Sequence, residues 1–105
     1  MRTFGVSVVN GKVWCDTEQV RVKRGSVKEF DVRLDHNFAD DYELRITVKD
    51  DPGDCLSMER KSSKFVRLID DNQTPGQIKF GIELVPLPNS GAKPVTALDP
   101  IIDND

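Results

Sequence analysis

Three short acidic segments are the strongest candidates for chemistry in this sequence: Asp40-Asp41, Asp50 to Asp54, and Asp70-Asp71-Asn72. Loops that are far apart in sequence can gather at one end of a domain, and carboxylate oxygens are the hard ligands that Ca²⁺ prefers. The metal candidates are therefore Asp50, Asp51, Asp54, Asp70 and Asp71. None of the segments has the spacing of an EF-hand loop. The interpretation we favour is that Asp and Asn stand here because they form turns; Ca²⁺ binding is the alternative.

Catalytic motifs are missing from the sequence. His36 is the only histidine, and no Cys, His or Met follows Gln77. A blue-copper site needs a second His and a Cys, so we exclude one and expect His36 to be an exposed or capping loop residue. The sequence has no Gly-x-Ser-x-Gly motif and no glycine-rich phosphate-binding loop. We therefore predict a protein that is not an enzyme and that has no catalytic residue and no cofactor.

Cys15 and Cys55 are the two cysteines. They are too few for a disulfide scaffold, so we expect two reduced thiols. The alternative is one bridge, which would stabilise the fold by closing a long loop. Trp14, the only tryptophan, is expected in the core; if Val13 faces inwards instead, Trp14 becomes an exposed contact.

Charge and hydropathy restrict the partners. The net charge is −3, and the 15 Lys and Arg are interspersed with 18 acids. That distribution gives no basic field for a phosphate backbone, so we expect no nucleic-acid partner. No apolar run approaches the roughly 20 residues of a membrane span, and the N-terminal apolar stretch ends at Asn10-Gly11 instead of continuing as in a signal peptide. We expect a cytoplasmic protein without membrane contact.

The elements that must position these residues are strands. From Gln77 to Pro86 every second residue is apolar, which is the period of a half-buried β-strand. Asn10-Gly11 predicts a hairpin turn, since both residues tolerate positive φ. The other predicted strands are Thr3 to Val9, Lys12 to Cys15, Gln19 to Lys23, Val27 to Leu34, Tyr42 to Lys49, Phe65 to Ile69 and Val95 to Ile102.

Two segments have weaker patterns. Cys55 to Lys64 has little periodicity, so we expect a loop with a short helical turn around Leu56 to Lys61. Val95 to Ile102 carries Pro100, which cannot donate to a β-ladder, and Pro94 precedes it, so we expect an edge strand. The sequence predicts an all-β fold: an immunoglobulin-like antiparallel β-sandwich of about seven or eight strands, as one domain over residues 1–105.

A resemblance supports this expectation. The segment Val6 to Val13, followed by Val20 to Val27, resembles the start of cupredoxin-like and immunoglobulin-like sandwiches. The late strand around Phe80, followed by Leu98 to Asn104, is similar to small bacterial proteins of the DP-EP family, named for acid-proline motifs such as Asp51-Pro52. The resemblance implies an immunoglobulin-like sandwich and adds no mechanism.

We therefore expect a non-catalytic binding or interaction module. Its partner would be another protein or a second copy of the chain, because an edge strand offers unpaired N–H and C=O groups. The alternatives are a Ca²⁺-binding module of the same fold that uses the acidic loops, and a small enzyme.

Overall fold

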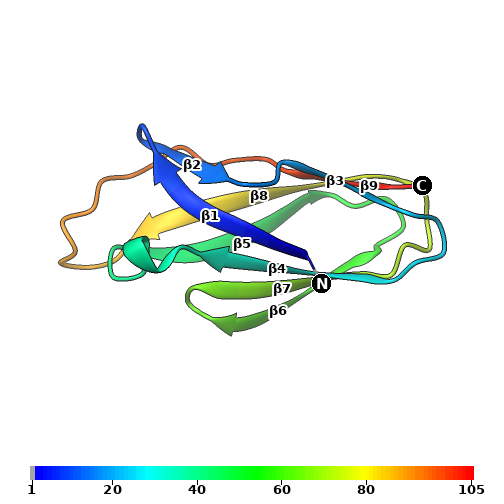
Figure 1. Ribbon diagram of the computed structural model, residues 1–105, viewed down its shortest axis with the longest axis horizontal. Coiled ribbons are helices and arrows are strands. Elements are labelled where there is room, and N and C mark those ends of the chain that lie inside the picture. The colour runs from blue at the N-terminus through cyan, green and yellow to red at the C-terminus, as the bar shows by residue number, and fades with distance from the viewer. Residues whose placement is uncertain (1) are drawn as a thin grey trace.

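The computed structural model describes residues 2–105, and its strands form two sheets packed face to face (Figure 1). The strands are β1 (Arg2–Val9), β2 (Lys12–Cys15), β3 (Gln19–Val22), β4 (Lys28–Leu34), β5 (Tyr42–Asp50), β6 (Leu56–Ser62), β7 (Phe65–Asp70), β8 (Gly76–Pro86) and β9 (Ile101–Asn104). A short 3₁₀ helix, η1 (His36–Phe38), follows β4. The predicted fold class, an all-β sandwich, is confirmed.

One sheet has five strands in the order β2-β1-β4-β7-β6, and the other has four in the order β3-β9-β8-β5. Most neighbours are antiparallel, but β1 pairs with β4 in parallel, and so does β3 with β9. The sandwich thus has nine described strands and mixed sheets. A periodicity of two places a residue on one face of a strand, and it carries no information on the direction of the neighbouring strand.

The strand pattern follows from local sequence. Asn10 and Gly11 have φ of 52° and 75°, as a tight hairpin requires, and they join β1 to β2. In β8, Ile78, Phe80, Ile82 and Leu84 are buried, while Lys79 and Glu83 are exposed. Phe4 packs edge-on against Phe30 and Phe80, with ring centroids 5.7 and 5.9 Å apart. These rings join the two sheets, because Phe80 belongs to the four-stranded sheet and the other two rings to the five-stranded sheet.

The expected helical turn around Leu56 to Lys61 is wrong, because this segment is strand β6. β6 lies at the edge of the five-stranded sheet, and β7 is its one partner among the described strands. Every residue of β6 after Leu56 is exposed. A strand exposed on both faces has no apolar alternation, so its sequence does not reveal it.

Two further expectations are wrong. From Val95 to Ile102 the regular strand begins only at Ile101, and β9 lies inside its sheet between β3 and β8. The earlier residues contribute two isolated bridges, one from Thr96 and one from Leu98. Trp14 is 49% exposed, because Val13 and Cys15 take the inward positions of β2.

Candidate functional site

One end of the sandwich collects the β5–β6 loop, the β7–β8 loop and the end of β9 (Figure 1). The backbone holds these segments together: Asp71 N donates to Cys55 O between the two loops, and Gly76 at the start of β8 pairs with Asn104 at the end of β9. Asp40 and Asp41 lie at the other end of β5, where Leu87 N donates to Asp41 O. The first acidic segment is therefore separate from the other two.

The predicted metal candidates have different environments at this end. Asp50 and Asp54 are exposed. Both oxygens of Asp51 accept backbone bonds, from Cys55 N at 3.0 Å and from Leu56 N at 2.9 Å. Asp51 therefore organises its own loop. This is the turn-forming role expected for an Asp, and it occupies both carboxylate oxygens.

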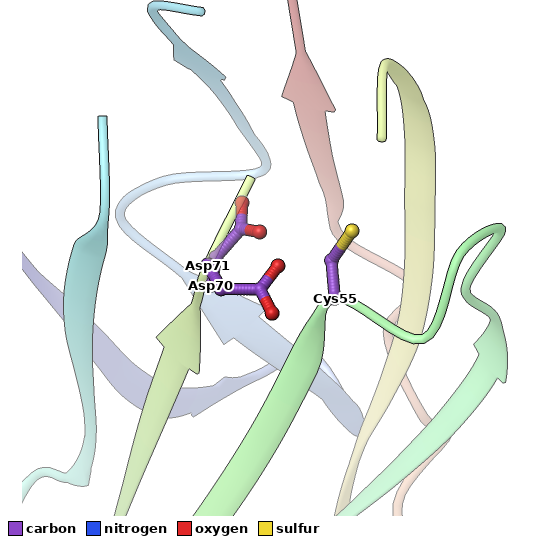
Figure 2. Close-up of side chains that lie close together, drawn as sticks. All are labelled: Cys55, Asp70 and Asp71. Atoms are coloured by element: carbon purple, nitrogen blue, oxygen red, sulfur yellow. The ribbon is translucent and has the colours of Figure 1, made fainter. Parts of the chain in front are cut away.

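Asp70 and Asp71 lie beside Cys55, and one potential ligand atom from each of the three residues lies within 4.8 Å of the others (Figure 2). Figure 2 shows the Asp70 carboxylate directed into the space between the end of β7 and the start of β6. Asp71 is half-buried, and its Oδ1 accepts a bond from Gln73 N. The Cys55 Sγ contacts two carbonyl oxygens, those of Pro52 at 3.8 Å and Thr74 at 3.9 Å.

Asp70 is the unusual residue of the group, because it is fully buried on the core-facing side of β7. Its Oδ1 accepts bonds from Asn72 N at 2.9 Å and from Asn104 Nδ2 at 3.0 Å. Its Oδ2 meets no donor within the described chain. Two more oxygens among residues 2–105 share this condition, Oδ1 of Asn72 and Oδ1 of Asn104, and both side chains are buried.

We call Asp70, Asn72 and Asn104 the oxygen cluster. A buried acceptor without a donor costs about 1 to 3 kcal/mol, so three in contacting residues need a physical explanation. Burial raises the pKa of the Asp70 carboxyl above its ordinary value of 3.8; the bonds from Asn104 and Asn72 oppose that shift, and the charges of Asp71 and Asp51 add to it. The cluster is thus rich in acceptors and lies in a negative field.

Sequence reasoning found Asp70 and Asp71 but did not predict their contact with Cys55, and it missed Asn104. A signal for Asn104 existed. Ile102 is buried, and strand alternation then turns Asn104 to the same inner face. Asn72 stood within a recognised acidic segment, but its burial depends on the bond from its Nδ2 to Lys23 O at 2.7 Å, which joins loops far apart in sequence.

A second candidate region is a hollow of about 980 Å³ between β3 and the start of β4. Its lining includes the cations Arg21, Lys23 and Lys28, the acid Glu29, and Val27, which is 65% exposed. Arg21 has only a weak ion pair, at 3.8 Å from Asp105, with both side chains exposed. The hollow is therefore open, mainly cationic and partly apolar.

The hollow lies along an open sheet edge, since within residues 2–105 β3 pairs with β9 on one side and with no strand on the other. Two other edges are partly covered. The β2 edge exchanges backbone bonds with Thr96. The β5 edge is covered by the β6–β7 turn, where Leu44 N donates to Ser63 O and Arg60 donates to Leu44 O. β6, the fourth edge, carries the charged run Glu59-Arg60-Lys61, which discourages pairing.

The remaining candidates are unremarkable in the structure. The His36 side chain is 91% exposed beside Asp35, whose Oδ1 accepts a bond from Asn37 N, so His36 is the exposed loop residue expected. Cys15 and Cys55 are both free and buried. Burial raises the pKa of the Cys15 thiol to about 11, which keeps it protonated at neutral pH. Within residues 2–105, no helix has the length and hydropathy of a membrane span.

No protein-family model matches the chain, and no curated protein matches it. Among solved structures, the chain is similar to the endo-fucoidan hydrolase MfFcnA4 of glycoside hydrolase family 107, with a TM-score of 0.53 and 20% identity over 92% of this chain. A variant of that hydrolase gives a TM-score of 0.54 at 17% identity over 93% of this chain. The chain spans only 14% of either hydrolase. At these identities the likeness shows the fold alone.

The chain is also similar to the cysteine protease inhibitor EhICP2 from Entamoeba histolytica. The TM-score is 0.49 and the identity 12%, over 84% of this chain and 86% of the inhibitor.

Proposed function

We propose that the chain is a non-catalytic binding module, and that it adds an extended, acidic segment of a partner protein to the open edge of β3. The observation that carries the proposal is the cationic hollow along β3, which among the described edge strands is the one that no other segment covers and that has no run of consecutive charged residues. In β-strand addition, main-chain bonds provide affinity, and pockets for alternate side chains provide specificity.

The cations of the hollow support an acidic segment. The outward positions of β3 include Arg21, and Lys23 and Lys28 line the same hollow, against one acid, Glu29. Acidic side chains of an added strand would meet these cations, and its apolar side chains would meet Val27. A second copy of the chain fits less well, because pairing two β3 edges would oppose like charges, which is unfavourable across strands.

The proposal also covers the family of the sandwich and its cellular compartment. We infer from the segments Val6 to Val13, Val20 to Val27 and Leu98 to Asn104 that the sandwich is a relative of immunoglobulin-like domains and of the bacterial DP-EP proteins. We also infer, from the N-terminal pattern, that it acts in the cytoplasm. None of these inferences is needed for the edge-binding proposal.

The test uses two peptides of about seven residues, one alternating Val and Glu and the other alternating Val and Lys. We expect the acidic peptide to shift the backbone amide signals of Gln19 to Lys23 and of Val27 in NMR spectra of labelled protein, and the basic peptide to shift none. Arg21→Glu should weaken binding at least about tenfold, a difference of about 1.4 kcal/mol. Lys93→Glu, an exposed cation in a loop outside the hollow, is the matched control and should bind as the wild type does.

Two results would contradict the proposal. Equal binding of both peptides would show that charge does not select the partner. Signal shifts around Trp14, with none at β3, would move the binding surface to the outer face of the five-stranded sheet.

A further inference from the structure

The core of the sandwich ends in oxygen atoms at the end where β7 and β9 finish. Along β7 the inward residues are Val66, Leu68 and Asp70, so the third inward position is a carboxylate instead of an apolar group. Along β9 the inward residues are Ile102 and Asn104, where an amide takes the last position. Asn72, just beyond β7, completes the oxygen cluster.

We propose that the oxygen cluster is a Ca²⁺ site, in which Asp70 Oδ2 supplies the charge and the amide oxygens of Asn72 and Asn104 are neutral co-ligands. All three atoms are buried acceptors that meet no donor within residues 2–105. Asp70 has no exposed surface, and Asn72 and Asn104 are 6% and 3% exposed. This inference does not depend on the proposed binding at the β3 edge.

The field around the cluster favours a cation. None of the ion pairs found among residues 2–105 involves Asp70. The charged side chains that act on Asp70 are those of Asp71 and Asp51, both negative. Asp71 uses one oxygen for Gln73 N, and an oxygen of its half-buried carboxylate lies within 4.8 Å of an Asp70 oxygen, close enough to share a cation with it. A divalent cation would satisfy the acceptors and offset the repulsion between the acids.

The type of ligand favours Ca²⁺ over Zn²⁺. Carboxylate and amide oxygens together are the donor set of Ca²⁺ sites, whereas Zn²⁺ sites are built on thiolate and imidazole. Cys55 borders the cluster, but its Sγ contacts the carbonyl oxygens of Pro52 and Thr74, as a protonated thiol does. His36, the only imidazole, belongs to η1 outside the cluster.

The cation would act as a structural cross-link. Asp70 ends a strand of one sheet, Asn104 ends a strand of the other, and Asn72 reaches the β3–β4 loop through Lys23 O. A single ion bound to all three would hold both sheets and the β3–β4 connection together at one end.

The test is calorimetric titration of CaCl₂ into wild-type protein freed of metal with EDTA, together with thermal unfolding with and without CaCl₂. We expect one Ca²⁺ per chain and a rise of about 5 °C or more in Tm at saturating CaCl₂, reversed by EDTA. MgCl₂ should bind more weakly, because Mg²⁺ needs a smaller octahedral shell and gives up its water reluctantly.

Matched variants separate ligand loss from general damage. Asp70→Asn should weaken Ca²⁺ binding at least about tenfold, while Asp54→Asn, an exposed acid at the same end, should leave it unchanged. Asn72→Gly removes the amide without backbone strain, because Asn72 has φ of 50°, which glycine adopts freely. Asn89→Gly makes the same change at an exposed residue with φ of 62° and should not affect Ca²⁺ binding.

Three results would overturn the proposal. The first is a wild-type chain with neither a heat of Ca²⁺ binding nor a shift in Tm. The second is Ca²⁺ binding that Asp70→Asn leaves intact, which would place the ion on exposed acids. The third is binding of ZnCl₂ without CaCl₂ that Cys55→Ala abolishes, which would assign a thiolate site instead.

Discussion

Asp31 and Asp70 are both buried, and they lie on the neighbouring strands β4 and β7, but their environments differ. Asp31 is on the outer face of its sheet. Arg67 Nε donates to its Oδ1 at 2.9 Å, and Arg33 lies 3.6 Å from its Oδ2. Asp70 is on the inner face, where two N–H donors bond its Oδ1 and none of residues 2–105 donates to its Oδ2.

The difference shows how position in the sandwich decides the partner of a buried acid. An outer-face carboxylate can be covered by long basic side chains from adjacent strands, which keep their own surface in water. The inner face is closed to such side chains by the opposite sheet. A charge there needs a proton, a small ion or a fixed dipole, and this is why Asp70 is the candidate ligand while Asp31 is a structural ion pair.

The largest expected loss of stability comes from the apolar core. The changes expected at Asp31 and Asp70 are compared with it. Phe80→Ala should lower the free energy of unfolding by about 3 to 5 kcal/mol, because Phe80 is fully buried against Phe4. Lys79→Ala, the exposed neighbour, should be nearly neutral. Denaturant melts of both variants measure this. If Asp31→Asn cost as much as Phe80→Ala, the buried ion pair rather than apolar packing would dominate stability.

The next effect tests the ion-paired acid. Asp31→Asn keeps the shape of the side chain and removes its charge, so the bond from Arg67 loses its charge assistance. We expect a loss of about 2 kcal/mol at pH 7 in chemical denaturation. Asp35→Asn, which alters an exposed cap on η1, should cost less. An Asp31→Asn variant as stable as the wild type would show that Asp31 contributes no more than a surface acid does.

The smallest expected change is a gain of stability instead of a loss. In EDTA at pH 7, Asp70→Asn should raise the free energy of unfolding by about 1 kcal/mol, because it removes a buried charge that has no ion-pair partner among residues 2–105. With CaCl₂ present, the wild type should become more stable than the Asp70→Asn variant. Equal losses of stability from Asp31→Asn and Asp70→Asn in EDTA would contradict the distinction between an ion-paired acid and a buried acid without a cation.

The stability gained by Asp70→Asn should depend on pH. Since the pKa of Asp70 is raised in the folded state, the folded chain binds this proton more tightly than the unfolded chain. Stability is then highest below the unfolded value of 3.8 and falls as pH rises from there through the raised folded pKa. The gain from Asp70→Asn should therefore be full at neutral pH and vanish in acid. Melts in EDTA across this range measure it, and a gain that persists in acid would rule out ionisation as its cause.

The sequence alone determined the class of fold and most strand positions, because alternation with a period of two and turn residues such as Asn10-Gly11 are local properties. It also identified Asp70 and Asp71 among the acids worth considering. The sequence did not predict strand β6, because an exposed strand has a weak local pattern. It also predicted the wrong inward residue in β2, because either Trp14 or Val13 could face the core.

Only the tertiary structure decided which acids are exposed, which acid bonds its own loop, and which acid is buried with one carboxylate oxygen that meets no donor among residues 2–105. That outcome depends on pairings between distant segments: β9 inserted between β3 and β8, Asn104 donating to Asp70, and Asn72 reaching Lys23 O. The parallel pairs and the open edge of β3 arise in the same way. Side-chain periodicity defines the faces of a strand, but the choice of neighbouring strand depends on packing over the whole core.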